Sequence, residues 1–182
     1  MKDLIDRAAK AGVHVVLGNR KWVEARLGDY AATGIDRSSG PGNVLEIGSG
    51  KPENGEYVYS MRHVFPHDEV RMSDIVTDFG HEVIDVTTMT FDAEFDAIVC
   101  LSVLEHLPDP AAAVAAMHRA LKPGGSALIG VPFAYPLHDE PADYWRFTEH
   151  GLRLLTTNYD HVEVHRRGPR KLPSGLLAVA RR

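Results

Sequence analysis

Cysteine is nearly missing from this chain of 182 residues, which contains Cys100 and no other cysteine. One cysteine cannot form an intrachain disulfide, and it cannot supply a zinc site built from several thiolates. Apolar runs are also short, and none approaches the roughly 18 consecutive residues of a membrane-spanning helix. The first residues, Met1 to Leu4, do not lead into the apolar core of a signal peptide. We therefore expect a cytoplasmic protein without a membrane span.

Positive charge is in the minority, with 20 Lys and Arg residues against 25 Asp and Glu residues and a net charge of −5. A protein that coats nucleic acid usually has the opposite balance, because it neutralises phosphates with Lys and Arg. The length suits one domain, and 44% hydrophobic with 25% charged residues is ordinary for a globular chain. The composition predicts one globular domain and argues against nucleic acid as a partner.

Two phosphate-binding glycine motifs are incomplete in this sequence. Gly48-Ser49-Gly50 begins a dinucleotide fingerprint, but Glu53 occupies the position of the third glycine, which such sites use for close packing of helix and strand. The same loop lacks the Gly-Lys-Ser/Thr ending of a P-loop. These absences argue against NAD and against a P-loop nucleotide as the ligand.

Hydrophobic patterning predicts alternating strands and helices. Continuous apolar runs indicate buried strands, and apolar residues at a spacing of three and four indicate helices. Asp109 is a suitable N-cap before Pro110, and Thr148 is a suitable N-cap before Glu149. We predict strands at 43–47, 69–75, 82–86, 95–101, 126–131, 161–166 and 175–180, and helices at 4–12, 22–31, 57–65, 110–123 and 148–156. Such alternation is typical of a doubly wound α/β fold.

A glycine pair directly follows the first predicted strand, in the segment Val44-Leu45-Glu46-Ile47-Gly48-Ser49-Gly50. Open α/β sheets bind ligands at the carboxyl edge of their strands, and glycine lets a ligand lie against bare backbone. The pattern Glu46-x-Gly48-x-Gly50 resembles motif I of the class I S-adenosylmethionine-dependent methyltransferases.

Further landmarks of the same family follow in the expected order. They are Asp74, Asp85-Val86, Asp96, Leu104-Glu105-His106-Leu107 and Leu121-Lys122-Pro123-Gly124-Gly125. Residues 136–148 are similar to a segment of the small Methyltransferase type 11 group, so the resemblance extends over about residues 43–156. It implies a Rossmann-like, seven-stranded, mostly parallel sheet with an antiparallel last strand and helices on both faces.

The resemblance implies S-adenosylmethionine as methyl donor and S-adenosylhomocysteine as product. The family places an acidic residue on the ribose hydroxyls, here Asp74, and a carboxylate is suited to accept hydrogen bonds from a cis-diol. It places Asp85 on the adenine amino group and the backbone N–H of Val86 against the ring. For the glycines a tight turn remains the competing interpretation, for Glu46 a structural carboxylate, and for Asp85 a loop cap. The implied cofactor-binding residues are Glu46, Gly48, Ser49, Gly50, Asp74, Ile75, Asp85, Val86, Leu101 and Ser102.

Ten histidines are many for this length, and they are scattered along the chain. Two pairs lie close in sequence, but no third convergent ligand is visible, so we expect no metal site. His106 follows the fourth strand, and His138 lies in the aromatic, proline-rich connection after the fifth. Loops at this edge line substrate sites. We predict His106 and His138 as catalytic candidates that accept a proton when the methyl acceptor is a hydroxyl.

The expected organisation is one domain over residues 1–182. It comprises a helical leader and substrate cap at 1–42, a cofactor-binding core at 43–132, and a substrate loop with closing helix and strands at 133–182. Tyr135, Tyr144, Trp145 and Phe147 would form an amphipathic wall for the acceptor.

This organisation predicts methyl transfer to a small or medium-sized acceptor, such as a metabolite, a sugar or a lipid-linked intermediate. Few residues remain outside the core for a substrate cap, so a homodimer is a further expectation. The alternatives are a non-catalytic, cofactor-binding partner subunit and a nucleic-acid methyltransferase, which the charge balance argues against.

Overall fold

The computed structural model describes residues 20–182 apart from 55 and 58, so the helix expected at 4–12 lies outside the described residues. A helix over residues 20–33 comes first. It is followed by β1 (Asn43–Ile47), β2 (Glu69–Asp74), β3 (Glu82–Val83), β4 (Phe95–Leu101), α2 (Pro110–Ala120), β5 (Leu121–Pro132), α3 (Glu149–Leu155), β6 (His161–Arg167) and β7 (Gly175–Arg181). Short 3₁₀ turns are η1 (Arg62–Val64), η2 (Thr77–Phe79) and η3 (Leu104–His106).

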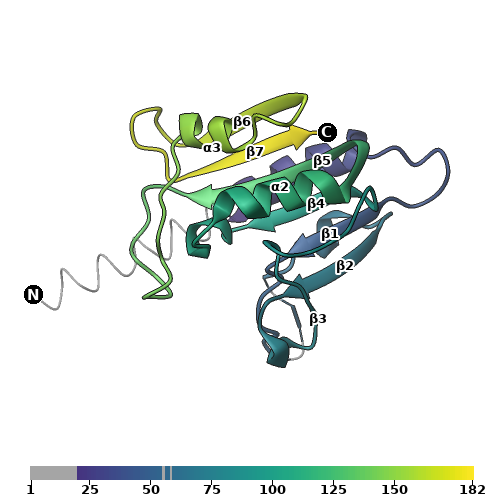
Figure 1. Cartoon of the computed structure of the whole chain (residues 1–182), viewed down its shortest axis with the longest axis horizontal. Coiled ribbons are helices and arrows are strands. Elements are labelled where there is room, and N and C mark those ends of the chain that lie inside the picture. The colour runs from purple at the N-terminus through teal and green to yellow at the C-terminus, as the bar shows by residue number, and fades with distance from the viewer. Residues whose placement is uncertain (1–19, 55, 58) are drawn as a thin grey trace, which may run out of the picture.

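The strands form one seven-stranded sheet in the order β3-β2-β1-β4-β5-β7-β6 (Figure 1). Strands β1 to β5 pair in parallel, whereas β7 is antiparallel to both β5 and β6. This confirms the predicted Rossmann-like sheet with an antiparallel last strand. From β1 the chain moves outward to β3 and then returns to β4 on the other side, so the topological switch point lies between β1 and β4. Ligands of open α/β sheets bind at that point, outside the carboxyl ends of the strands.

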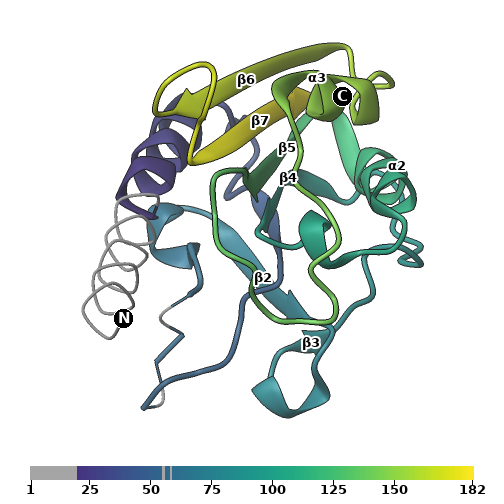
Figure 2. The same ribbon diagram turned by 90° about the vertical axis from the view of Figure 1, so that its left-hand side faces the viewer.

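Helices cover both faces of the sheet, as Figure 2 shows with the 20–33 helix on one side and α2 and α3 on the other. Val44 of β1 packs in one buried cluster with Leu27 and Ala31 of the first helix. Its neighbour Leu45 packs in the other cluster with Val114 and Met117 of α2. Successive strand residues point to opposite faces, so a strand covered on both sides is apolar throughout. Among the described residues, no helix combines the length and the apolar character needed to cross a membrane.

Capping side chains begin α2 and α3 where the sequence predicted. Asp109 Oδ1 accepts a hydrogen bond from the backbone N–H of Ala112 at 3.0 Å, and Pro110 is the first helical residue. Thr148 Oγ1 accepts from the N–H of Gly151, also at 3.0 Å. Each cap satisfies a backbone donor that the first helical turn leaves unpaired.

The helix predicted at 57–65 is wrong, because the described residues of that segment contain a single 3₁₀ turn, η1. The backbone N–H of Met61 and the hydroxyl of Ser60 donate to the buried carboxylate of Glu46, each at 2.5 Å. These long-range bonds hold the segment against β1 in a shape that local helical periodicity does not reveal.

Two element boundaries also differ from prediction. Helix α2 ends at Ala120 and not at Gly124-Gly125, because Leu121 already pairs with Phe95 of β4 in the sheet. Strand β3 is limited to Glu82–Val83, so Asp85 and Val86 lie in the turn beyond it. Both changes leave the predicted order of elements intact.

Candidate active site

The glycine loop after β1 has the conformation that its sequence requires. Gly48 and Gly50 have φ angles of 73° and 76°, in the left-handed region that favours glycine. A Cβ on Gly48 would lie 2.5 Å from a methyl carbon of Val103, and a Cβ on Gly50 would lie 3.0 Å from Cβ of Tyr59. Both positions therefore require glycine, because the backbone angles and the neighbouring side chains leave no room for a Cβ.

The side chain of Glu46 holds this loop in place through hydrogen bonds. Its carboxylate is buried and accepts hydrogen bonds from the hydroxyls of Ser49 and Ser60 and from the N–H of Met61. The backbone carbonyl of Glu46 accepts another bond from the Ser73 hydroxyl at 2.8 Å. Because three protein donors occupy the carboxylate, the geometry favours the structural interpretation of Glu46.

Asp74 connects the end of β2 to the glycine loop. Its carboxylate accepts the N–H of Gly50 at 3.0 Å and the N–H of Val76 at 3.1 Å. A carboxylate has about four acceptor positions, so two remain for a ligand. The neighbouring side chain of Ile75 is 61% exposed, which is unusual for an isoleucine beside a strand end.

Asp85 caps the turn that follows β3. Its Oδ1 accepts the N–H and the hydroxyl of Thr87 at 2.8 and 2.6 Å, and these bonds lower the pKa of the carboxyl. The side chain of Thr88 adds a further hydrogen bond, so the competing loop-cap role is present. The side chain of Val86 is buried in the core, so only its backbone is available to a ligand.

The predicted cofactor residues Leu101 and Ser102 lie at the end of β4 and directly after it. Ser102 adopts a φ of 52°, and its N–H donates to the carbonyl of Gly130 in β5 at 2.8 Å. Residues 133–148 then return across η3, where the N–H groups of Tyr144 and Trp145 donate to the carbonyl of Glu105 at 2.8 and 3.2 Å. Figure 1 shows this returning loop beyond the arrowheads of β4 and β5.

Three side chains from η3 and the returning loop converge: Glu105, His106 and His138. The Nε2 atoms of His106 and His138 each lie 3.9 Å from Oε1 of Glu105, and the two imidazole rings meet edge to face with centroids 4.8 Å apart. Glu105 is fully buried, and among the described residues neither carboxylate oxygen has a hydrogen-bond donor. Burial raises the pKa of the Glu105 carboxyl to about 7. The structure thus joins the two predicted catalytic histidines through a carboxylate between them.

Each imidazole is oriented by its Nδ1 atom. Nδ1 of His106 lies 2.8 Å from the carbonyl oxygen of Ala142, and Nδ1 of His138 lies 3.2 Å from that of Pro136. A carbonyl only accepts, so both Nδ1 atoms carry a hydrogen, and in the neutral form of each imidazole the lone pair is then on Nε2. Asp143 lies 3.3 Å from His138 Nδ1 and is held by Arg146 at 2.6 and 2.7 Å. The Arg146 guanidinium keeps the pKa of the Asp143 carboxyl well below its usual value.

Aromatic side chains surround this cluster, although one expected member is absent. Tyr144 and Trp145 are 51% and 44% exposed, and Trp145 Nε1 donates to the carbonyl of Leu107 at 2.8 Å. The ring of Tyr135 lies 5.0 Å from that of His138. Phe147 instead packs in the core with α2, so its predicted place in the wall is wrong. Its position next to the N-cap of α3 carries it inward, which the aromatic composition of the loop did not indicate.

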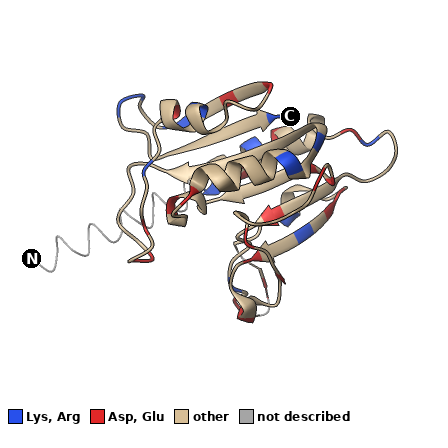
Figure 3. Ribbon diagram, viewed as in Figure 1, with Lys and Arg blue, Asp and Glu red and all other residues tan. Residues whose placement is uncertain are grey.

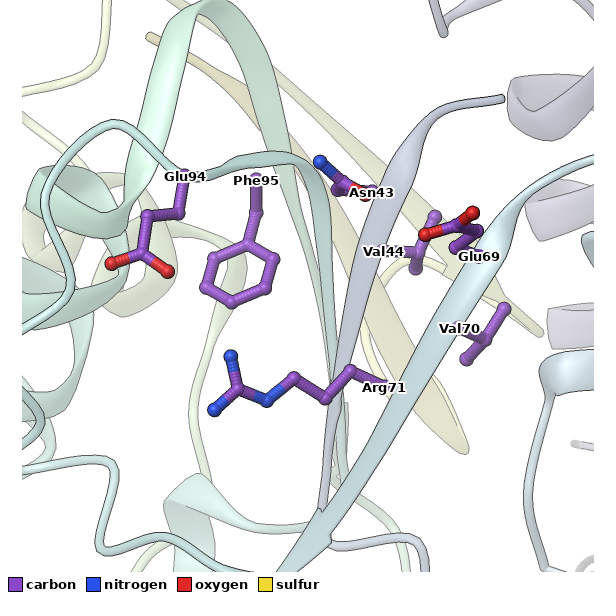
Figure 4. A pocket seen from close by; sticks show the side chains of 7 residues that line it. All are labelled: Asn43, Val44, Glu69, Val70, Arg71, Glu94 and Phe95. Atoms are coloured by element: carbon purple, nitrogen blue, oxygen red, sulfur yellow. The ribbon is translucent and has the colours of Figure 1, made fainter. Parts of the chain in front are cut away.

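A hollow of about 380 Å³ lies at the opposite end of the strands (Figure 4). It is bordered by the first residues of β1, β2 and β4, namely Asn43, Glu69 and Phe95, and by Arg71. The Arg71 guanidinium reaches toward the ring of Phe95 in this view, at 6.0 Å from the ring centroid. Parallel sheets bind their ligands at the carboxyl edge, so this hollow is not the cofactor site.

Two functional candidates were missed by reasoning from sequence. Glu105 is not among the site residues predicted from sequence, because its burial and its missing donors depend on the returning loop. His81 lies beyond η2, yet its Nε2 is 2.8 Å from the carbonyl of Gly50 and its ring packs on Tyr57. No local pattern indicates that contact, since 31 residues separate His81 from the glycine loop.

The sheet order defines a Rossmann-like protein whose topological switch point lies between β1 and β4, where such folds bind ligands. The family model described as a methyltransferase domain matches residues 20–166. The chain therefore belongs to the class I S-adenosylmethionine-dependent methyltransferases, which confirms the resemblance and its cofactor.

Individual relatives extend this result. A ubiquinone biosynthesis O-methyltransferase of Pseudomonas paraeruginosa is 26% identical over 114 residues, which are 59% of this chain and 47% of that protein. The chain thus spans at most about half the length of the curated relatives it matches.

Solved structures share the fold. The 1,6-didemethyltoxoflavin-N1-methyltransferase of Burkholderia thailandensis, with bound 1,6-didemethyltoxoflavin and S-adenosylhomocysteine, has a TM-score of 0.59 and 22% identity over 96% of this chain and 86% of that chain. A SAM-dependent methyltransferase of Archaeoglobus fulgidus has a TM-score of 0.62 and 16% identity, over 90% and 94% of the two chains.

Proposed function

We propose that this chain transfers the methyl group of S-adenosylmethionine to a hydroxyl oxygen of a small or medium-sized acceptor. The observation that carries the proposal is the convergence of the Nε2 atoms of His106 and His138 on Glu105 just beyond β4, with each Nδ1 held by a backbone carbonyl. A neutral imidazole in this orientation accepts the proton that a hydroxyl must lose.

The methyl donor would occupy the edge between the glycine loop and the ends of β2, β3 and β4. The left-handed turns at Gly48 and Gly50, with Ser49 between them at the switch point, support placing its methionine end there. The two remaining acceptor positions of Asp74 suit the ribose hydroxyls. The exposed face of Ile75, with Asp85 and the backbone of Val86, suits the adenine ring. Leu101 and Ser102 would lie between the donor and the histidines.

The chemical step requires that the acceptor hydroxyl be aligned with the methyl group of the donor and that it lose one proton. The donor supplies an electrophilic methyl group, because its sulfur carries a positive charge. The acceptor hydroxyl gives its proton to Nε2 of His106 or His138, and its oxygen forms the new O–CH₃ bond. The electron pair of the broken S–CH₃ bond stays on sulfur, which leaves neutral S-adenosylhomocysteine. Alignment of the two reactants contributes roughly 7–11 kcal/mol and general-base catalysis about 100-fold or more.

The surroundings of the cluster support an acceptor of modest size. Tyr135, Tyr144 and Trp145 offer flat apolar faces with polar edges, as a ring-bearing or lipid-linked hydroxyl compound requires. In the view of Figure 3, Lys and Arg are interspersed with Asp and Glu along the described chain, in contrast to the one-signed face of a nucleic-acid enzyme. The name of the Pseudomonas relative, an O-methyltransferase, also favours a hydroxyl acceptor.

Calorimetric titration with S-adenosylmethionine and S-adenosylhomocysteine tests the donor site. Binding of both is expected, and binding of neither would refute the proposal. Turnover is then measured on a panel of phenols, catechols, sugars and their O-methylated counterparts. Methyl transfer to a free hydroxyl but not to its methyl ether is the expected result. Donor binding without transfer to any member would favour the non-catalytic partner subunit.

A matched set of variants tests the two histidines. His106→Ala and His138→Ala should each lower kcat by about 100-fold, the usual contribution of a general base, while the donor Kd stays unchanged. His67→Ala is the control, because His67 is exposed in the segment between η1 and β2. Equal kcat values for all three variants would show that neither imidazole handles the proton.

A further inference from the structure

The Glu105 carboxylate is buried without a hydrogen-bond partner among the described residues, which is rare in native proteins. Its side chain is fully buried, and within the described part of the chain neither oxygen has a hydrogen-bond partner. Burial of an isolated carboxylate is strongly unfavourable, and such a group is normally paired with a cation or bound to a metal. The nearest cationic candidates are the imidazoles of His106 and His138, both at 3.9 Å and so beyond hydrogen-bond distance.

The two imidazoles are oriented as metal ligands are. A ligating histidine usually donates its other ring N–H to a carbonyl or carboxylate, which fixes the ring and directs the free lone pair at the ion. His106 has Ala142 O in that role, and His138 has Pro136 O together with Asp143. The backbone N–H of His138 also donates to Asp143 at 3.0 Å, so the carboxylate fixes both ring and backbone.

We propose that Glu105, His106 and His138 bind one divalent transition-metal ion. One ligand atom from each of the three lies within 4.8 Å of the others. Two ligands at about 2.1 Å from a tetrahedral ion are roughly 3.4 Å apart, so the two 3.9 Å separations need to close by about half an ångström, and the widest separation, up to 4.8 Å, by more than 1 Å. Ion binding therefore requires the two partly exposed histidine side chains to rotate toward Glu105.

The donor set favours zinc-like ions over magnesium. Two imidazole nitrogens and one carboxylate oxygen suit Zn²⁺, Fe²⁺, Co²⁺ or Ni²⁺, whereas Mg²⁺ prefers oxygen ligands. Three protein ligands also leave a position open, as in catalytic rather than structural zinc sites. The exposed side chain of Asp139 approaches from that side, with Oδ2 at 4.0 Å from His106 Nε2.

The use of the ion in catalysis rests on the proposed function, whereas its binding does not. An ion at this position would orient the acceptor hydroxyl and lower the pKa of that hydroxyl. Its proton would then leave to solvent water, and the imidazoles would serve as ligands through the same lone pairs that otherwise accept the proton.

Metal titration of the full chain tests the binding itself. Protein freed of metal with a chelator is titrated with ZnCl₂ by calorimetry and with CoCl₂ by visible absorption, with MgCl₂ as the contrasting ion. We expect one Zn²⁺ per chain, a cobalt spectrum in the visible range, and no comparable heat with Mg²⁺. Glu105→Gln and His138→Ala should each weaken Zn²⁺ binding by at least about tenfold, while His67→Ala should not.

A second group of residues provides a stringent control. On β6, Glu163 lies 3.3 Å from His161 and 3.7 Å from His165, so surface zinc binding there would imitate the expected signal. The double variant His161→Ala/His165→Ala should retain the site. Loss of Zn²⁺ binding in that variant, unchanged binding in Glu105→Gln, or no binding by the wild type would each overturn the proposal.

Parallel titration with S-adenosylmethionine separates this proposal from the proposed function. Glu105→Gln and His138→Ala should bind the methyl donor as the wild type does, since neither residue lies on the glycine loop. Zinc binding without donor binding would leave the metal site standing and refute methyl transfer. Donor binding and turnover that persist after chelation would leave methyl transfer standing and refute the use of the ion in catalysis.

Discussion

Two buried glutamates at the carboxyl edge of the sheet differ sharply in their surroundings. Glu46, beside the glycine loop, is 4% exposed and accepts hydrogen bonds from Ser49, Ser60 and Met61. Glu105, beside the returning loop of residues 133–148, is fully buried and accepts no hydrogen bond from the described residues. The protein supplies three donors to the first carboxylate, which favours a structural role for it. The Glu105 carboxylate keeps its acceptor positions available for a ligand.

The carboxyl edge of the sheet shows the same difference between the region around the glycine loop and the region around η3. Around the glycine loop, Glu46, Asp74 and His81 bind backbone groups and make a rigid cradle. Around η3, the side chains orient one another but leave the Nε2 atoms of His106 and His138 without a hydrogen-bond partner among the described residues. We interpret the first region as a preformed binding site for the methyl donor, because its polar groups are already held by hydrogen bonds. In the second region, polar atoms without a protein partner remain available to bind the acceptor.

The largest expected effect is on stability, from the same substitution at both glutamates. Glu46→Gln should lower the free energy of unfolding by about 2–3 kcal/mol, because an amide group then faces donors that need an acceptor. Glu105→Gln should leave it unchanged or raise it, because no hydrogen bond is lost and a buried charge is removed. Urea unfolding in the presence of chelator measures both. Equal losses would mean that Glu105 has a stabilising partner after all.

Next in size is the effect of Asp74→Ala on the methyl donor. The substitution removes the acceptor for Gly50 N–H and the proposed acceptor for the ribose, so the Kd should rise ten- to a hundredfold. The far-UV circular dichroism should stay native. Asp92→Ala, at an exposed position in the loop before β4, is the control and should leave the Kd unchanged. An unaltered Kd in Asp74→Ala would mean that the ribose binds elsewhere.

A smaller effect is expected for Asp143→Asn, which changes a residue that orients His138 without touching the proposed ion. Removal of such an outer carboxylate typically weakens metal binding by about tenfold. Zinc calorimetry should show that change, and titration with S-adenosylmethionine should show none. If zinc affinity is unaffected, the orientation of His138 depends on Pro136 alone.

The smallest effect should come from a third glutamate, the exposed Glu82 of β3. Its ion pair with Arg71 lowers the pKa of the carboxyl, so its stabilisation is present above the unfolded pKa of about 4.3 and is lost as the pH falls through the lowered value. Glu82→Gln should cost about 0.5 kcal/mol or less at pH 7 and nothing well below pH 4. Urea unfolding at both pH values tests this, and a loss above 1 kcal/mol would contradict it.

The strands, the glycine loop and the helix caps could largely be predicted from local sequence. The apolar runs of β1 and β4, the glycine pair, and the caps Asp109 and Thr148 all act over a few residues, so their pattern predicts their structure. The failures have the opposite character. Residues 57–65 are held by Glu46 from another strand, and α2 stops early because Leu121 pairs with β4. Long-range hydrogen bonds overrode local helical preference in both places.

By itself the sequence determined the order of elements, the class of fold and the glycine loop, because each depends on contiguous residues and their periodicity. Only the tertiary structure decided which polar groups are satisfied and which are not. Glu105 and His138 are 33 positions apart, and their meeting depends on a loop that returns across η3 through backbone bonds to Glu105 O. Burial without partners is a property of that three-dimensional arrangement, so the composition of the loop does not reveal it.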